Sequence, residues 1–83
     1  MDTSEVRRSR LEGISAAAAR IEACPREELE ALAAELGARI TYTSGAEQCR
    51  LFGIRASATM DRPTAIQAWA RAARRQIAKI GGA

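Results

Sequence analysis

The chain has 83 residues and a formal net charge of +3, and 47% of its residues are hydrophobic. A chain of this length forms one domain that removes only about 60–65% of its unfolded surface from water, so a large internal active-site cavity is not expected. Alanine supplies much of the hydrophobic fraction, which leaves few bulky side chains to fill a core.

The positive charge is concentrated in the C-terminal half. Residues 1–35 hold eight acids against five arginines, a balance of −3, whereas residues 36–83 hold two acids against eight cations, a balance of +6. Such an imbalance favours an anionic partner, either nucleic acid or an acidic protein surface. Nearly all of the cations are arginine, which suits bidentate contacts with carboxylate or phosphate. A coding sequence biased toward arginine and alanine codons would give the same excess without functional meaning.

The sequence shows no targeting segment and no metal site. No apolar run reaches the ~20 residues of a membrane span, and the segment MDTSEVRRSR lacks the apolar stretch of a signal peptide, so we expect a cytoplasmic protein. Cys24 and Cys49 stand alone, without a histidine or a C-x-x-C pair, so we expect no zinc site and no cofactor. Two reduced thiols are the simplest interpretation, and a single disulfide between them stays open.

Two helices are predicted in the N-terminal half. The first covers residues 3–23, where apolar side chains recur at helical spacing, and residues 1–10 are expected to fray or to project beyond the core. Cys24-Pro25 ends it, because the residue before proline is disfavoured in the α region. The second helix runs from 25 to 36, and Gly37 follows it at the position of a left-handed cap. Its buried stripe is predicted to be Leu29, Leu32 and Leu36.

Three short strands are predicted next, over residues 38–43, 48–52 and 54–60. The segment SGAEQ turns the chain between the first two. Phe52-Gly53 fits a type II turn with glycine at its third position, which favours an antiparallel meander; one bent strand running through Gly53 is the alternative.

A last helix is predicted to start after Asp61, which can cap it, and to end at Gly81-Gly82. Its apolar side chains fall within one arc: Ile66, Trp69, Ala70, Ala73, Ile77 and Ile80. The cations Arg71, Arg75 and Lys79 line the opposite side. The whole chain, residues 1–83, is therefore predicted to be one α+β domain of order α-α-β-β-β-α, with its helices on one face of the sheet.

Alternation along the strands separates a buried face from a solvent face. The inward set is Ile40, Tyr42, Cys49, Leu51, Ile54, Ala56 and Ala58, and the outward set is Thr41, Thr43, Arg50, Phe52, Arg55, Ser57 and Thr59. Arginine is enriched at interface hot spots, so Arg50 and Arg55 are the first candidates for a partner-binding surface, and Phe52 is a candidate beside them. The alternative for Phe52, which lies at a turn, is to fold over the edge of the sheet. The plain interpretation is that polar residues keep an open sheet face soluble.

The last helix offers a second candidate surface. Its basic stripe consists of Arg71, Arg74, Arg75 and Lys79. The plain interpretation is stronger here, because cations near the end of a helix are favoured by the helix dipole whatever the function. The acids Glu27, Glu28, Glu30 and Glu35 are interpreted as the solvated side of the second helix.

Catalysis is not indicated. The chain has no histidine, and most of its acids fall at capping or solvent-facing positions of the two N-terminal helices. Ser44-Gly45 lacks the flanking glycines of a nucleophile elbow, and no glycine-rich phosphate loop leads into a helix. We expect a protein that is not an enzyme.

Helix, three strands and helix over residues 25–80 resemble the topology of a double-stranded-RNA-binding domain. That family places a lysine-rich motif at the start of its last helix, where it contacts the phosphates. The corresponding segment here is RPTAIQ, which holds one cation, Arg62. The resemblance implies the order of the elements but does not supply that family's mode of RNA binding.

A second resemblance covers about half of the chain. The segments LEALAAELGARI, CRLFGIRASAT and AIQAWARAARRQI are similar to those of short Ala/Arg-rich proteins from phages and prophages of high-GC bacteria, a group that includes anti-CRISPR proteins. This resemblance implies a non-catalytic inhibitor in the cytoplasm of a bacterial host. Such an inhibitor docks on the effector complex of a type I CRISPR system, Cascade, and sterically blocks target DNA.

The remaining interpretations differ in the partner that they assign to the chain. Many inhibitors of this kind are acidic DNA mimics, whereas a basic C-terminal half favours docking on an acidic or mixed protein surface. The expected partner is a host protein or nucleoprotein complex, not a membrane. Two alternatives stay open: a nucleic-acid-binding module that uses the basic half, and a phage assembly or structural accessory protein.

Overall fold

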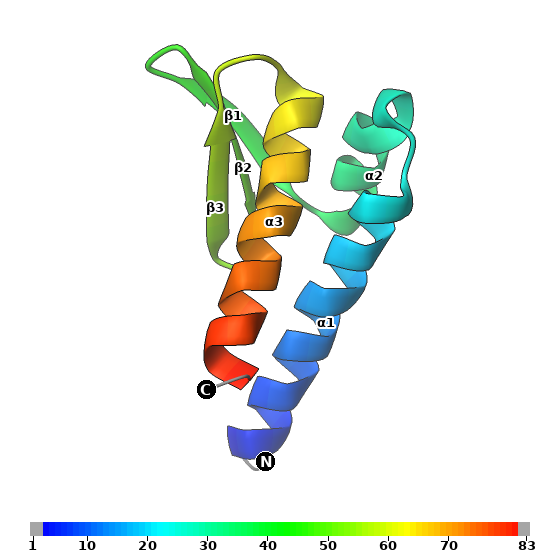
Figure 1. Ribbon diagram of the computed structural model, residues 1–83, viewed down its shortest axis with the longest axis vertical. Helices are drawn as coiled ribbons and strands as arrows, with labels where there is room; N and C mark the ends of the chain where they lie inside the picture. Colours follow the sequence, from blue (N-terminus) through cyan, green and yellow to red (C-terminus); the bar gives the residue numbers. More distant parts are fainter. Residues whose placement is uncertain (1–2, 82–83) are drawn as a thin grey trace.

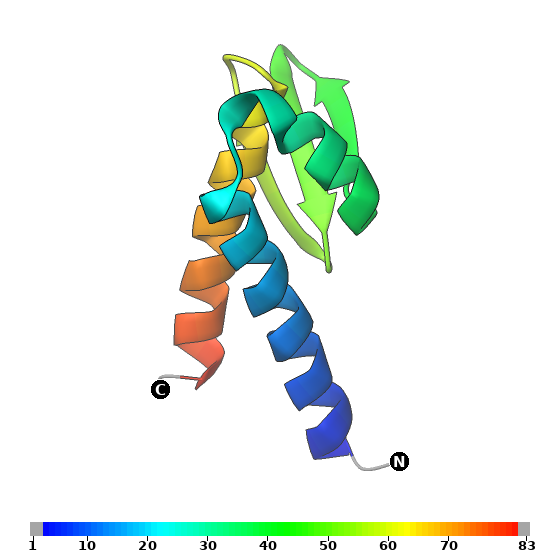
Figure 2. The ribbon, with the colours of Figure 1, turned by 90° about the vertical axis from the view of Figure 1, so that its right-hand side faces the viewer.

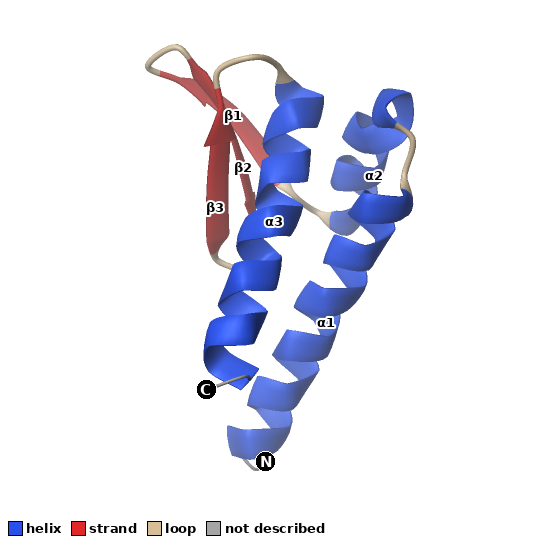
Figure 3. Cartoon of the chain, viewed as in Figure 1, coloured by secondary structure: helices blue, strands red, loops and turns tan. Residues whose placement is uncertain are grey.

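Residues 3–81 fold as three α-helices on one side of a three-stranded antiparallel sheet (Figures 1 and 3). The structure is a computed structural model that describes these residues, with side chains from residue 8 to residue 79. The order of the elements is α-α-β-β-β-α, which confirms the predicted α+β fold. In this part of the chain, no helix is both long enough and apolar enough to cross a membrane.

The first helix, α1 (Thr3–Ala23), has the predicted bounds. Its buried face consists of Ile14, Ala17, Ala18 and Ile21, which recur at the spacing that the sequence pattern indicated. Figures 1 and 2 show that the N-terminal turns of α1 extend past the end of the sheet, as expected for residues up to 10. Residues 1 and 2, which belong to the same prediction, lie outside the described residues.

The predicted second helix is present, but its first turn is tighter than an α-helix. A 3₁₀ turn, η1 (Arg26–Glu28), follows Pro25 and leads into α2 (Leu29–Leu36). Gly37 has a φ of 83°, and its N–H donates to the carbonyl of Ala34 at 3.1 Å. The left-handed cap predicted at Gly37 is therefore confirmed.

The three strands are β1 (Arg39–Thr43), β2 (Ala46–Leu51) and β3 (Ile54–Ala58). They pair in the order β1-β2-β3, with both pairs antiparallel. The predicted meander is confirmed, and the alternative of one bent strand through Gly53 is wrong.

Both hairpin turns differ from their predictions. Ser44 and Gly45 have φ values of 53° and 81°, and Phe52 and Gly53 have values of 54° and 75°. Positive φ at both central residues is the signature of a type I′ turn, whose twist matches that of the flanking strands. The type II turn predicted at Phe52-Gly53 is wrong for this reason. The tight first turn also lets β2 begin at residue 46, two residues earlier than predicted, and β3 ends at 58 instead of 60.

The last helix, α3 (Arg62–Gly81), starts at the predicted cap. The Asp61 carboxylate accepts hydrogen bonds from the Thr64 N–H at 2.9 Å and from the Thr64 hydroxyl at 2.6 Å. Its other oxygen accepts from Arg26 of η1. These contacts hold the pKa of Asp61 below its ordinary value, chiefly through Thr64 and then through Arg26. Asp61 thus caps α3 and ties it to the start of α2.

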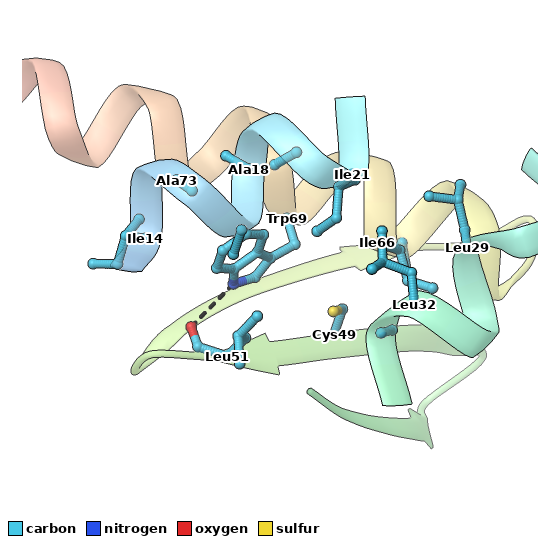
Figure 4. Close-up of a cluster of buried hydrophobic side chains, with 14 residues drawn as sticks. Ile14, Ala18, Ile21, Leu29, Leu32, Cys49, Leu51, Ile66, Trp69 and Ala73 are labelled. Carbon is cyan, nitrogen blue, oxygen red and sulfur yellow. Dashed lines mark hydrogen bonds between the residues drawn. The ribbon is translucent and has the colours of Figure 1, made fainter. Parts of the chain in front are cut away.

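The core lies between the helices and the sheet and is centred on Trp69 (Figure 4). The Trp69 side chain is 0% exposed, and its indole N–H is shared between the carbonyls of Leu51 and Ile54, each at 3.1 Å. These two carbonyls flank the β2–β3 turn. One side chain of α3 therefore fills the centre of the core and fastens that hairpin to the helical layer.

Tyr42 departs from the predicted core. Alternation places it on the helical side of β1, paired with Glu47 of β2, but its side chain is 67% exposed. Tyr42 lies one residue from the end of an edge strand, where the helices do not cover it. The sequence pattern gave the direction of the side chain and could not give the extent of the helical layer.

Candidate functional site

The bare side of the sheet carries a continuous polar surface, which we call the arginine face. It consists of the side chains that alternate away from the helices: Arg39, Thr41, Thr43, Gln48, Arg50, Arg55 and Ser57. Arg50 and Arg55, the first candidates from the sequence, both lie on it and are exposed.

Three arginines form one row across this face. Arg39 of β1 pairs with Arg50 of β2, and Arg50 pairs with Arg55 of β3. Directly paired residues of antiparallel strands have Cα atoms about 4.5–5.5 Å apart, so the row brings three positive charges side by side. Like charges in directly opposed positions destabilise a sheet. The row is therefore a feature that the fold tolerates and does not require.

No acid between residues 8 and 79 neutralises the row. Among the described side chains, no carboxylate lies within ion-pair distance of Arg39, Arg50 or Arg55. The one acid within the three strands, Glu47, alternates to the helical side, and its carboxylate lies 3.7 Å from Arg62 of α3. The next row of the face pairs Thr41, Gln48 and Ser57, which supply uncharged hydrogen-bonding groups beside the arginines.

Sequence reasoning missed Arg39. Its position in ARITYT, two residues before Thr41, already placed it on the outward side of the first strand. What the sequence could not give was the register, because a predicted five-residue turn left the pairing of Arg39 with Arg50 undetermined. The two-residue turn at Ser44-Gly45 fixes that pairing.

Phe52 does not belong to the arginine face, so its predicted place in the outward set is wrong and the alternative, a side chain that folds away from that face at the turn, is closer to the structure. Its ring lies against α1, 3.2 Å from the position that a Cβ on Gly13 would occupy, and its side chain is 38% exposed. The carbonyl of Phe52 accepts a hydrogen bond from Arg10 at 2.8 Å. Phe52 leaves the strand alternation because it sits at the first central position of the type I′ turn, with positive φ.

The predicted basic stripe of α3 is divided between two roles. Arg74 donates to both carboxylate oxygens of Glu22 on α1, at 2.8 Å and 3.0 Å, and to the Ser15 hydroxyl at 3.4 Å. The hydrogen bonds from Arg74 lower the pKa of Glu22. Arg74 therefore joins α3 to α1. Arg71, Arg75 and Lys79 are exposed and have no ion-pair partner among the described carboxylates.

The free cations of α3 face different surroundings. Arg71 lies beside Cys24 and Gln67 in a shallow hollow of about 300 Å³ between α1 and α3. Arg75 and Lys79 line a larger groove of about 980 Å³ that also reaches Arg55 at the border of the arginine face. The four residues of the stripe therefore do not form one contact surface.

Both cysteines are free thiols in the structure. Cys49 is 1% exposed, and burial raises its pKa to about 11. Partial burial, and then the charges of Glu28 and Glu27, also raise the pKa of Cys24. Neither thiol has the lowered pKa that marks a reactive cysteine.

The fold and its exposed face define a small α+β domain with a basic, hydroxyl-bearing sheet surface. Comparison with known proteins adds no family to this class: no family model, no curated protein and no solved structure matches the chain.

Proposed function

We propose that the chain is a non-catalytic binding module that docks its arginine face on an anionic surface of a partner protein or nucleoprotein complex. The observation that carries this proposal is the row of Arg39, Arg50 and Arg55, which lies on the bare side of the sheet with no described acid to neutralise it. An arrangement that disfavours the free domain is expected where a partner supplies the missing negative charge.

The chemistry of the face suits such a partner. Guanidinium groups bind carboxylates and phosphates in bidentate fashion, and arginine is among the residues that dominate interface energies. The row of Thr41, Gln48 and Ser57 adds shorter polar groups next to the cations. The sheet holds the backbone of these residues in place, so that the backbone loses little entropy when the partner binds.

In its most specific form, the proposal is a phage-type inhibitor of the anti-CRISPR kind, acting in the cytoplasm of a bacterial host on a type I effector complex. This form rests on the resemblance of three sequence segments, and the arginine face supports it by offering a surface for an acidic or mixed protein site. A domain with extents of 40 × 24 × 22 Å, once docked near the DNA path, would block target DNA by occupying space.

The test combines co-purification with phage plating. The wild-type chain is expected to co-purify with a type I effector complex and to restore plating of a targeted phage, whereas Arg50→Glu is expected to do neither. Arg71→Glu is the matched control, because it reverses one exposed charge on α3, away from the sheet face. Failure of the wild type with every type I subtype would refute the inhibitor, and equal activity of Arg50→Glu would refute the arginine face as its docking site.

Nucleic-acid binding is the second candidate, and the spacing of the arginine row is the observation that favours it. Three adjacent guanidinium groups with hydroxyls beside them are also suited to a phosphate backbone. Arg62, at the position where double-stranded-RNA-binding domains place their lysines, is instead paired with Glu30 at 3.5 Å and Glu47 at 3.7 Å. Binding would therefore use the sheet face and not that family's helix terminus.

A salt titration separates the two candidates. Three phosphate contacts on duplex DNA predict a slope of about −2.7 in log K against log salt concentration, at roughly 0.9 per contact. Absence of any anisotropy change with duplex DNA or RNA at low salt eliminates nucleic acid as the partner. If the wild type shows a slope of this size and Arg50→Glu lowers its magnitude by the amount of about one phosphate contact, the face binds nucleic acid instead of protein.

A further inference from the structure

The sheet ends at the β2–β3 turn, whereas the two long helices continue past it (Figures 1 and 2). A groove lies in this region. Figure 2 shows α1 and α3 diverging toward their free ends in this region. Helical faces that the sheet covers farther up are uncovered here, which leaves a groove of about 980 Å³. Its apolar surface comes from three elements, namely Leu11 and Ile14 of α1, Phe52 and Ile54 of the hairpin, and Ala72 of α3.

Four cations lie beside this apolar surface. Arg10 of α1, Arg55 of β3 and both Arg75 and Lys79 of α3 line the groove, and none of its lining side chains between residues 8 and 79 is acidic. Arg75 and Lys79 are one helical turn apart, so they project from the same side of α3. None of these four cations has an ion-pair partner among the described carboxylates.

The groove is formed before any ligand binds. The Arg10 guanidinium donates to the carbonyl of Phe52 at 2.8 Å, and the Phe52 ring rests on α1 at Gly13. Trp69 holds the other side of the same hairpin through the carbonyls of Leu51 and Ile54. The hairpin is thus tied to both long helices, and a ligand would meet a fixed surface.

We propose that this groove binds an acidic amphipathic helix of a partner protein. An apolar floor bordered by cations matches a helix whose apolar stripe, repeating at three and four residues, is flanked by aspartate and glutamate. Charge complementarity selects the occupant, because the four charged residues among the described lining are all positive. A nucleic-acid backbone would satisfy the cations but would leave the exposed parts of Leu11 and Phe52 without an apolar partner.

A second copy of the chain is a poorer occupant than a separate protein. Four of the ten acidic residues of the chain gather on η1 and α2, at Glu27, Glu28, Glu30 and Glu35. The apolar stripe of α2, however, is already buried in its own core through Leu29 and Leu32. That helix can therefore present charge to a groove but not the apolar side chains that the floor requires.

The groove is a separate site from the arginine face, and the two have only Arg55 in common. The two sites can be separated by mutation, since Arg75 and Lys79 lie on α3 whereas Arg39 and Arg50 lie on the sheet. Loss of the groove and loss of the arginine face are therefore distinguishable results.

The experiment is a peptide-display selection against the folded protein, using a library of helix-forming peptides of about 16 residues, roughly 24 Å long as a helix. We expect the enriched peptides to combine aspartate or glutamate with an apolar stripe of helical period. Synthetic copies are expected to bind Arg75→Glu/Lys79→Glu at least tenfold more weakly than wild type, and to bind Arg39→Glu as wild type. Far-UV circular dichroism and thermal melting confirm that each variant is folded.

Several results would overturn the proposal. Enriched peptides without acidic residues, or peptides that bind the double variant as tightly as wild type, would exclude an acidic helix in the groove. Sensitivity to Arg39→Glu alone would move the peptide to the arginine face. If no peptide is selected, and wild type binds a duplex DNA probe that the double variant does not bind, the groove cations would be assigned to nucleic acid. Concentration-dependent sedimentation abolished by the double variant would assign the groove to a second copy of the chain.

Discussion

Gly13 of α1 and Phe52 of the β2–β3 turn are fitted to each other. A methyl group at Gly13 would lie 3.2 Å from Cζ and 3.3 Å from Cε1 of the Phe52 ring, closer than side chains normally approach. Glycine in a helix interior costs about 1 kcal/mol relative to alanine. The contact gives this cost a reason, because only a residue without a side chain lets the hairpin rest on α1.

A double-mutant cycle tests this relationship. In the background of Phe52→Ala, Gly13→Ala is expected to raise the free energy of unfolding by about 0.5–1 kcal/mol, the usual gain in helix propensity. In the wild-type background the gain should be smaller or reversed, because the new methyl group displaces the ring. Urea unfolding measures all four proteins. Equal effects of Gly13→Ala in both backgrounds, within about 0.3 kcal/mol, would show that the two residues are not coupled.

Trp69 is predicted to be the most sensitive single position of the core. Trp69→Phe removes the indole N–H from the carbonyls of Leu51 and Ile54 and leaves space around a smaller ring. The free energy of unfolding should fall by about 2–4 kcal/mol. Tyr42→Phe is the matched aromatic control and should change it little, because Tyr42 is 67% exposed. Circular dichroism during unfolding measures both variants. A similar loss of unfolding free energy for the two would contradict the assigned core.

The cap of α3 predicts a pH-dependent stability. Asp61→Ala removes the acceptor of the Thr64 N–H and is expected to lower Tm by roughly 4–8 °C near pH 7, as loss of a cap does in a domain of this size. Because the pKa of Asp61 is lowered in the folded state, its contribution is present above the unfolded pKa and is lost as pH falls through the folded pKa.

Thermal melts from pH 7 to pH 2 measure this dependence. The difference in Tm between wild type and Asp61→Ala should shrink in the acid range. Asp61→Asn is the control, since asparagine also caps helices, and it should retain most of the stability near pH 7. A wild-type to Asp61→Ala difference that stays constant down to pH 2 would show that the ionised carboxylate is not what stabilises the cap.

The two thiols should differ in their reactivity. Cys49 is 1% exposed and burial raises its pKa to about 11, whereas Cys24 is only partly buried. A thiol reagent at pH 8 is expected to modify Cys24 at least about 100-fold faster than Cys49, which should react only when the domain opens. Mass spectrometry of labelled peptides measures both rates. Equal rates in the native protein would contradict the burial of Cys49, and two unreactive thiols that reduction restores would indicate a disulfide.

Periodicity was sufficient to predict the helices and the meander, because the signals were local. Helical spacing bounded α1, and Gly37 and Asp61 marked a helix end and a helix start. The turn types could not be predicted in the same way. Ser44-Gly45 and Phe52-Gly53 both adopt positive φ at two successive residues, and nothing in the sequence marked Ser44 or Phe52 for that conformation.

The candidate site could be predicted only where its residues follow a local pattern. Strand alternation placed Arg50 and Arg55 on one side of the sheet, but their alignment with Arg39 depended on a turn length that the sequence left open. The ion pair of Arg74 with Glu22 joins residues 52 positions apart, so no local pattern separates Arg74 from its neighbour Arg75. The groove likewise depends on where the sheet ends relative to the two helices.

The central claim is that the arginine row serves a partner and not the fold, and the stability of Arg50→Thr tests it without the partner. Removing the middle charge should raise the free energy of unfolding at low salt by about 0.2–1 kcal/mol, because it relieves repulsion from Arg39 and Arg55. The gain should shrink in 1 M salt, which screens the repulsion. Gln48→Thr, on the same strand and face, controls for strand propensity. A loss of stability for Arg50→Thr at both salt concentrations would contradict the account.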